Sequence, residues 1–131
     1  YNQKAPSTSE SEIYKTESLR DGQKRIWARI KVGIPGLRLQ YHVNHLYEPK
    51  KDSLTWTLDY SKKSDFDDSA GYWYVIKHPD RPNHTRLFYS LEVRVFSWCP
   101  QFAVNLMSKQ ILTGTSIIFI PHPFIHLCTV L

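Results

Sequence analysis

Short runs rich in aromatic and β-branched residues, several alternating with polar residues, constrain the fold more than any other feature. In the clearest run, Leu37, Leu39, Tyr41 and Val43 alternate with polar side chains. Successive side chains of a β-strand point to opposite faces, so this period of two predicts a strand with one buried face. Turn signals separate the runs, which favours an antiparallel meander over parallel strands joined by helices. The six predicted strands lie at residues 13–17, 26–32, 37–43, 54–60, 71–77 and 85–95.

The pattern changes after residue 96, where the sequence favours a helix. Pro100 can open a helix, and Gly114 can end it. Between them, apolar residues recur at helical spacing, at Phe102, Ala103, Leu106, Met107 and Ile111. Strands followed by one amphipathic helix predict an α+β fold, with the helix over one face of a curved antiparallel sheet.

The chain has 131 residues, which is room for one domain. We expect a polar tail or loop over 1–12, a domain over 13–115 and an atypical apolar tail over 116–131. That last segment has no charged residue, and it is shorter than the roughly 20 apolar residues of a membrane span. We therefore expect no integral span, although transient membrane contact stays open. The abrupt change after Thr113 also suggests an alternative splice, a frameshift or a gene-model error.

The charge balance leaves the partner open. The net charge of +5 permits a nucleic acid or an anionic membrane without indicating either. The aromatic-rich motifs of RNA-binding sheets are absent, so we expect a solvated basic face and no nucleic-acid partner. Two cysteines, Cys99 and Cys128, are most simply free thiols in a reducing compartment.

The sequence carries no motif of a known catalytic or metal site. It has no glycine-rich phosphate loop and no serine in a nucleophile elbow. His42 and His45, three apart on a predicted strand, point to opposite faces and cannot chelate one metal. The loop Asp65, Asp67, Asp68 lacks the glycine turn and the bidentate glutamate of a calcium loop. We therefore expect no catalytic residue, no metal and no cofactor.

The apolar stripes of the strands and of the helix are the remaining candidate site. They can form an ordinary packed core, or they can line a ligand cavity. One helix is a thin cover for so much aromatic area, and buried tyrosine and tryptophan need hydrogen-bond partners, which favours a cavity. The candidate lining comprises Trp56, Leu58, Tyr60, Trp73, Val75, Leu87, Tyr89 and Leu91 from the strands, with Phe102, Leu106 and Met107 from the helix.

Four segments carry a family resemblance, at 56–60, 64–75, 85–93 and 98–102, followed by the amphipathic helix. A Gly-x-Trp strand, a proline-bearing loop, Thr-x-x-x-Tyr and a proline-opened helix occur in this order. The stretch from Tyr14 to about Thr113 thereby resembles the START-like superfamily, in its polyketide cyclase/dehydrase and coenzyme-Q-binding branch. The most similar members are uncharacterised ones from plants and algae.

The resemblance implies a helix-grip fold, in which a curved antiparallel sheet wraps around a long C-terminal helix and encloses an apolar cavity. It implies binding, and possibly transport, of a lipid or another hydrophobic small molecule. An enzyme of the cyclase or dehydratase type, using His42, Asp59 or Tyr89, and a protein-interaction domain with a vestigial pocket are the alternatives. The family's first strand and two short helices are missing before Tyr14, and the charged continuation of its long helix is missing after Leu112. The location expected is intracellular, in the cytoplasm or, with a missing transit peptide, in a plastid or mitochondrion.

Overall fold

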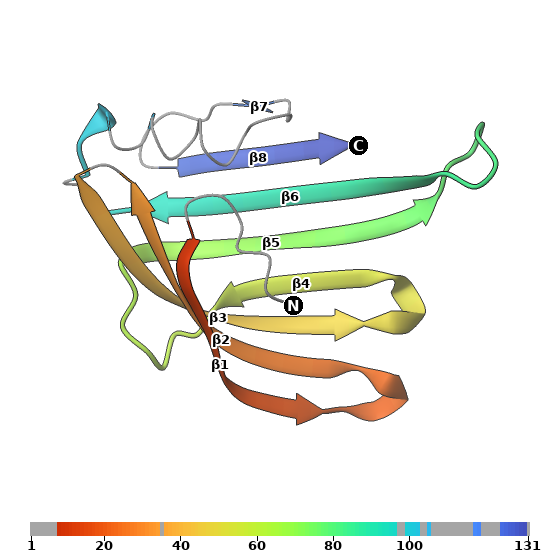
Figure 1. Cartoon of the computed structure of the whole chain (residues 1–131), viewed down its shortest axis with the longest axis horizontal. Helices are drawn as coiled ribbons and strands as arrows, with labels where there is room; N and C mark the ends of the chain where they lie inside the picture. Colours follow the sequence, from red (N-terminus) through yellow and green to blue (C-terminus); the bar gives the residue numbers. More distant parts are fainter. Residues whose placement is uncertain are drawn as a thin grey trace.

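The computed structural model describes residues 8–34, 36–96, 99–102, 105, 117–118 and 124–130; for Thr8, Ile34 and the last two segments it describes the backbone alone. Eight strands form one antiparallel sheet in the order β1-β2-β3-β4-β5-β6-β8-β7 (Figure 1). Two 3₁₀ turns, η1 (Arg20–Gly22) and η2 (Pro49–Lys51), connect neighbouring strands. The strands are β1 (Thr8–Ser18), β2 (Lys24–Ile34), β3 (Leu37–Glu48), β4 (Ser53–Leu58), β5 (Phe66–Lys77), β6 (Thr85–Val95), β7 (Ile117–Ile118) and β8 (Phe124–Val130).

The first six strands pair in chain order, which is the antiparallel meander that the sequence predicts. Several boundaries differ from the expectation. β5 begins at Phe66, so Asp67 and Asp68 of the expected acidic loop lie in a strand, and β3 continues past Val43 to Glu48. β1 begins at Thr8, so residues 8–12 belong to the sheet rather than to a polar tail. β4 ends at Leu58, so Tyr60 lies in the following loop rather than in a strand.

The expected α+β class with a C-terminal helix is wrong, because the structure is mostly β. Among the described residues, no helix reaches seven residues, and none is long and apolar enough to span a membrane. Of the expected helix, Gln101, Phe102 and Asn105 are helical, whereas Leu106 and Met107 lie outside the described residues.

The chain after residue 116 instead contributes strands to the sheet. β8 pairs with β6 from Phe88↔Val130 to Arg94↔Phe124, and β7 pairs with β8. The physical reason is the edge of β6, whose backbone N–H and C=O groups need partners once the meander ends. An apolar segment with β-branched residues can satisfy them in extended conformation.

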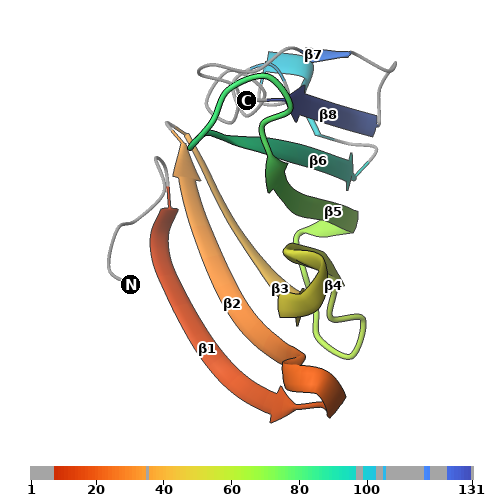
Figure 2. The same ribbon diagram turned by 90° about the vertical axis from the view of Figure 1, so that its right-hand side faces the viewer.

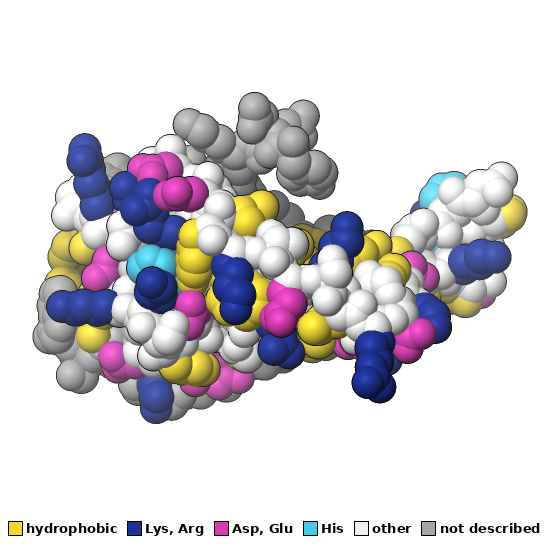
Figure 3. Space-filling view, turned by 90° about the horizontal axis from the view of Figure 1, so that it is seen from below, with side chains coloured by type: hydrophobic (Ala, Val, Ile, Leu, Met, Phe, Trp, Pro, Cys, Tyr) yellow, Lys and Arg dark blue, Asp and Glu magenta, His cyan; other side chains and the backbone are white. Residues whose placement is uncertain are grey.

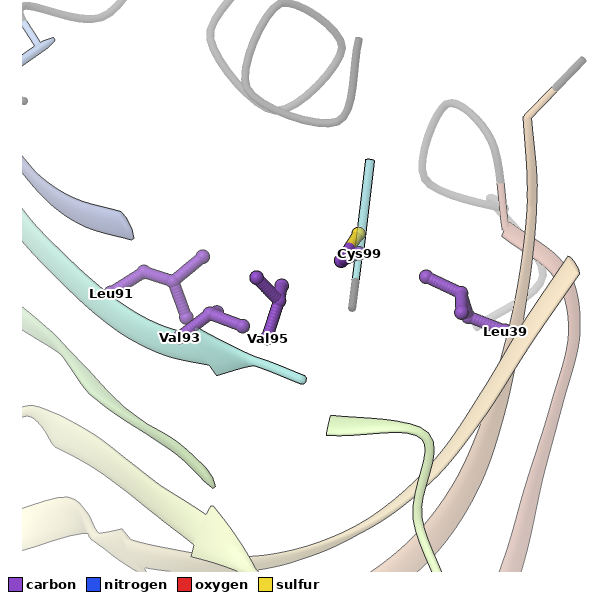
Figure 4. Close-up of a cluster of buried hydrophobic side chains, with 5 residues drawn as sticks. All are labelled: Leu39, Leu91, Val93, Val95 and Cys99. Atoms are coloured by element: carbon purple, nitrogen blue, oxygen red, sulfur yellow. The ribbon is translucent and has the colours of Figure 1, made fainter. Parts of the chain in front are cut away.

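The sheet is strongly curved, and its curvature brings distant strands to one core (Figure 2). Leu39 of β3 and Val95 of β6 belong to the same buried cluster, together with Leu91, Val93 and Cys99. Figure 4 shows Leu39 approaching this cluster from one side and the β6 side chains from the other. A second buried cluster contains Ala28, Val43 and Leu58. We call the face that carries both clusters the concave face, and the opposite side the convex face.

Ion pairs on the convex face hold the edge strand β1 in register. Glu10 lies opposite Lys31, whose Nζ donates to its carboxylate at 2.7 Å, and Glu12 lies opposite Arg29. Arg29 also reaches Glu10 at 2.7 Å and pairs with Glu12. The hydrogen bond from Lys31 is the first reason why the pKa of Glu10 is lowered. Opposite charges placed across two strands stabilise their pairing.

Candidate functional site

The strand register places seven of the predicted lining residues on the concave face. Val43, which is fully buried there, lies opposite Leu58, and the next pair on the same face is His45 and Trp56. Trp73 lies opposite Leu54 on one side and Tyr89 on the other, and Gly71 lies opposite Leu91. The seven residues are Trp56, Leu58, Trp73, Val75, Leu87, Tyr89 and Leu91.

The other predicted lining residues do not join this face within the described structure. Tyr60 is 70% exposed, and its hydroxyl donates to Asp68 at 2.6 Å. Phe102 is 67% exposed, so its ring is not in the core. Leu106 and Met107 lie outside the described residues. The candidate site is therefore built from strands β3 to β6.

An aromatic cluster of Trp56, Tyr89 and Trp73 crosses the middle of the concave face. The ring centroids of Trp56 and Tyr89 are 6.0 Å apart with the planes 28° from parallel. Those of Tyr89 and Trp73 are 4.4 Å apart, tilted by 39°. Trp73 stays 38% exposed, so the cluster offers part of its aromatic surface to solvent.

Gly71 is the reason why the Trp56 ring can lie where it does. The two residues are directly opposite each other on β5 and β4. A Cβ atom added to Gly71 would lie 2.2 Å from Cζ2 of Trp56 and 2.4 Å from the backbone oxygen of Ser90. The indole ring therefore lies over bare backbone, and only glycine leaves room for it at this position.

Three polar groups of the concave face are uncharged at neutral pH, and the two lysines that alternation places on this face, Lys24 and Lys77, lie at strand ends. Burial raises the pKa of Tyr41 and of Tyr89 to about 12, and Tyr41 also packs on Phe66 at 5.0 Å. Burial lowers the pKa of His45 below its ordinary value of 6.5, although a backbone hydrogen bond with Ile26 acts in the opposite direction. The face thus combines an apolar surface with neutral hydroxyl and imidazole groups, which suits an uncharged ligand.

The convex side carries a polar cluster that fixes a loop. The Tyr14 hydroxyl donates to Oδ2 of Asp59 at 2.6 Å, and the Tyr14 ring packs edge-on against His42 at 5.9 Å. Ser61 donates to the other Asp59 oxygen at 2.6 Å. Desolvation opposes ionisation of Asp59, but hydrogen bonds from Ser61 and Tyr14 outweigh it, and its pKa is lowered.

Tyr14 and Asp59 of this convex cluster hold each other in their ordinary protonation states at neutral pH. Desolvation, followed by the hydrogen bond to Asp59, raises the pKa of Tyr14 while that of Asp59 falls. Both values move away from neutrality, whereas a general acid or base needs a pKa near the operating pH. His42 and Asp59, which the enzyme alternative would use as catalytic groups, lie outside the concave face. His42 is opposite Arg29 in the strand register and points to the convex face, and Asp59 follows the end of β4.

Metal ligation finds no support in the part of the chain that the structure describes. No group of three or more histidine, cysteine, aspartate or glutamate side chains gathers there in a way that could hold an ion.

Three residues of the candidate site, Tyr41, His45 and Gly71, were not among the predicted lining residues. Tyr41 continues the alternation of Leu39 and Val43, so the pattern itself places it on the buried face. His45 follows two residues later in the same period. Gly71 carried no comparable signal, because its role depends on the pairing with Trp56, which a single sequence does not give.

Comparisons with protein-family models, curated proteins and solved structures give no match. The resemblance to the START-like superfamily therefore remains an expectation from the sequence.

Proposed function

We propose that the protein binds a hydrophobic small molecule or a lipid on its concave face. The observation that carries the proposal is the aromatic cluster of Trp56, Tyr89 and Trp73, which is exposed in part at Trp73 and has the apolar side chains of Leu54, Val75 and Leu87 on the same face. Aromatic rings that stay partly in water at the centre of an apolar surface are typical of ligand sites.

Energetics favours a ligand over a bare surface. A large aromatic side chain has about 150–250 Å² to bury. With 38% of Trp73 exposed, about 60–95 Å² stays in water, and its burial is worth about 2 kcal/mol at roughly 25 cal/mol per Å². An apolar ligand that covered Trp73 would gain this free energy of burial.

The electrostatics of the face define the ligand class. Tyr41 and Tyr89 have pKa values of about 12, and the pKa of His45 is lowered, so these three groups carry no charge at neutral pH. A neutral, apolar molecule fits such a surface, with a hydroxyl or carbonyl group as its only polar feature. For the cyclase or dehydratase alternative, the pKa of about 12 means that Tyr89 keeps its proton at neutral pH.

The test compares two tryptophans on opposite faces. Uptake of a fluorescent fatty acid and of a fluorescent isoprenoid would be titrated into the full chain, Trp73→Ala and Trp27→Ala. Trp27 lies opposite Asn44 on the convex face, where Lys15 packs over its ring at 4.2 Å. We expect Trp73→Ala to weaken uptake about tenfold or more, while Trp27→Ala binds like the parent chain.

Unfolding in urea separates a ligand surface from a solid core. Trp73→Ala in a packed core would cost about 3–5 kcal/mol, but at a partly exposed site we expect a loss below about 2 kcal/mol. A parent chain that takes up neither probe, together with a Trp73→Ala loss in the packed-core range, would refute the proposal. Mass spectrometry of extracts from the purified protein then distinguishes a bound lipid from a converted product, which would support an enzyme.

A further inference from the structure

We infer that the convex side of the β5–β6 hairpin binds single-stranded nucleic acid, a partner that the sequence motifs alone did not lead us to expect. This function uses the opposite face from the proposed ligand site and does not depend on it. The hairpin extends past its neighbours: β4 begins its pairing with β5 at Ser53↔Tyr74, and β8 begins its pairing with β6 at Val130↔Phe88. The amide of Val75 still donates to the oxygen of Asp52, and the loop between β5 and β6 projects beyond the neighbouring strands among the described residues, as Figures 1 and 3 show at the right-hand end.

Aromatic side chains lie at the root of this projection. Tyr72 and Tyr74 alternate with Trp73 on β5, so they point to the convex face, where they are 40% and 41% exposed. Phe88 lies opposite Tyr74, with the ring centroids 5.8 Å apart and the planes 34° from parallel. Exposed aromatic rings on an open sheet are a surface on which unpaired bases can stack.

Cations that are in none of the ion pairs of the described residues lie beside this surface and at the tip. Arg86 lies opposite Ile76 and shares the convex face with Phe88. Arg81 lies in the turn, and Lys77, the last residue of β5, alternates to the concave side and lines the hollow of the turn together with Arg81. Among the other described cations, Arg29, Lys31, Lys50 and Lys51 each pair with an aspartate or glutamate, whereas Lys24 and Arg25 of β2 are in none of these pairs. None of these ion pairs includes Lys77, Arg81 or Arg86.

The turn is also hollowed. A pocket of about 380 Å³ is lined by the side chains of the hairpin turn. The turn holds its shape by backbone hydrogen bonds, from the amide of His78 to the oxygen of His84 and from the amide of His84 to the oxygen of Arg81. Its lining offers hydrogen-bond donors to a phosphate group. The lining residues are Lys77, His78, Arg81, Pro82, Asn83, His84 and Thr85.

The chemistry of the hairpin favours single strands over the two nearest alternatives. A membrane-docking loop carries apolar residues at its tip, whereas residues 79–85 are exposed and include Asp80, Arg81 and Asn83. A duplex hides the faces of its bases, so the exposed tyrosines would add nothing to duplex binding. Aromatic rings beside the cations of the hairpin match the bases and phosphates of a single strand.

The test measures fluorescence anisotropy of a labelled oligouridylate of about 15 nucleotides with the full chain. Three phosphate contacts predict a slope of log affinity against log salt of about −2, or a loss of about 20-fold between 50 and 200 mM salt. Tyr74→Ala should weaken binding at least about fivefold, and Arg86→Gln should reduce the slope to about −1.4.

Two control variants match these changes. Tyr47 is 42% exposed but lies on the concave face, so Tyr47→Ala should bind like the parent chain. Lys63, exposed in the loop after β4, supplies the cation control as Lys63→Gln. Circular dichroism and urea unfolding confirm that each variant is folded, as expected for exposed side chains.

Three outcomes would overturn the inference. The first is no binding of the oligouridylate by the parent chain at 50 mM salt. The second is equal loss in Tyr74→Ala and Tyr47→Ala, or equal affinity for a duplex, because stacking on Tyr74 would then contribute nothing. The third is salt-dependent binding to phosphatidylserine vesicles without binding to the oligouridylate, which would assign the hairpin to a membrane surface. Tight binding to the single strand, lost in Tyr74→Ala alone of the two tyrosine variants, supports it.

Discussion

Substituting Gly71 by alanine tests the geometry of the aromatic cluster most directly. The new Cβ would lie 2.2 Å from Cζ2 of Trp56, 2.7 Å from its Cε2 and 2.4 Å from the backbone oxygen of Ser90. All three separations are far below van der Waals contact. The Trp56 ring is held between His45 and Tyr89, at centroid distances of 6.2 and 6.0 Å, and the Ser90 oxygen belongs to β6 itself. Neither neighbour can give way without moving a strand or breaking the stack.

Two opposing effects set the magnitude. Alanine restricts the unfolded chain more than glycine does, which stabilises a strand by about 0.5–1 kcal/mol where there is room. Overpacking costs typically about 1–3 kcal/mol, and the upper part of that range applies here because a backbone atom is among the clashing groups. The expected net loss is therefore about 1–2 kcal/mol. With an m-value of about 1–3 kcal/mol/M, the urea midpoint falls by roughly 1 M.

Gly33→Ala is the matched control. Gly33 lies within β2, and a Cβ there meets nothing within 4 Å, so only the stabilising effect should remain. Urea unfolding followed by tryptophan fluorescence gives both midpoints, and near-ultraviolet circular dichroism reports the Trp56–Tyr89 stack. Equal midpoints for the two variants, with an unchanged near-ultraviolet spectrum, would refute the packing of Trp56 over Gly71. In a Trp56→Ala background, part of the Gly71→Ala cost should disappear, because only the clash with Ser90 remains.

Three further predictions follow from titratable groups. Burial raises the pKa of Tyr41 from 10.0 to about 12. The stabilising contribution of the buried neutral hydroxyl should therefore be complete below pH 10 and be lost as the pH rises through 12. Urea midpoints of the parent chain and of Tyr41→Phe, measured across this pH range, test this prediction. The pKa of Glu10 is lowered, first by its hydrogen bond from Lys31. The contribution of Glu10 to stability is therefore present above pH 4.5 and should be lost as the pH falls through the pKa of Glu10 in the folded protein. Below that pH, the amide exchange rates of β1 in the parent chain and in Glu10→Gln should become equal. Cys99 is buried, and desolvation raises its pKa. In a Cys128→Ser variant, iodoacetamide should therefore react with Cys99 more slowly at pH 8 than with free cysteine. An equal rate would contradict the burial of Cys99.

The period of two was enough to predict five of the strands and the face on which their apolar residues lie. Strand alternation fixes the side on which a residue points, so Trp56, Trp73 and Tyr89 could be assigned to one face without knowing the register. The meander order was also accessible, because short turns leave antiparallel neighbours as the simplest pairing.

The C-terminal part of the fold could not be predicted from local pattern. The spacing of Phe102, Leu106 and Met107 says which side of a helix would be apolar, but not whether a helix long enough to cover the sheet forms. β8 forms by pairing with β6, which is a non-local interaction, and its apolar sequence shows no clear alternation against polar residues. Tyr60 was misplaced for a simpler reason: the alternation continues past Leu58, although the strand ends there.

The aromatic cluster itself depends on register and on curvature. Trp56 can stack near Tyr89 because Gly71 lies between β4 and β6 with no side chain in the way. Leu39 reaches the core of Val95 because the sheet bends, although their strands are not neighbours. Both facts join residues far apart in the sequence, and a single sequence without homologues does not contain them.

The two proposals meet at adjacent residues of β5, and this gives a last prediction. Trp73 faces the concave side with Tyr89, whereas Tyr74 faces the convex side with Phe88. Because neighbouring side chains of a strand point to opposite faces, the two functions should separate at this one step of the chain. Trp73→Ala should weaken uptake of the fluorescent fatty acid and leave the affinity for oligouridylate unchanged, and Tyr74→Ala should do the reverse.

Both assays on both variants decide between separate sites and a shared disturbance. The two side chains are similarly exposed, at 38% and 41%, so a general loosening of β5 should affect both variants alike. Loss of both activities in each variant would therefore mean that stability of the hairpin, rather than either surface, controls binding. Loss of one activity in each, in opposite order, would show that each face of a single strand carries its own binding function.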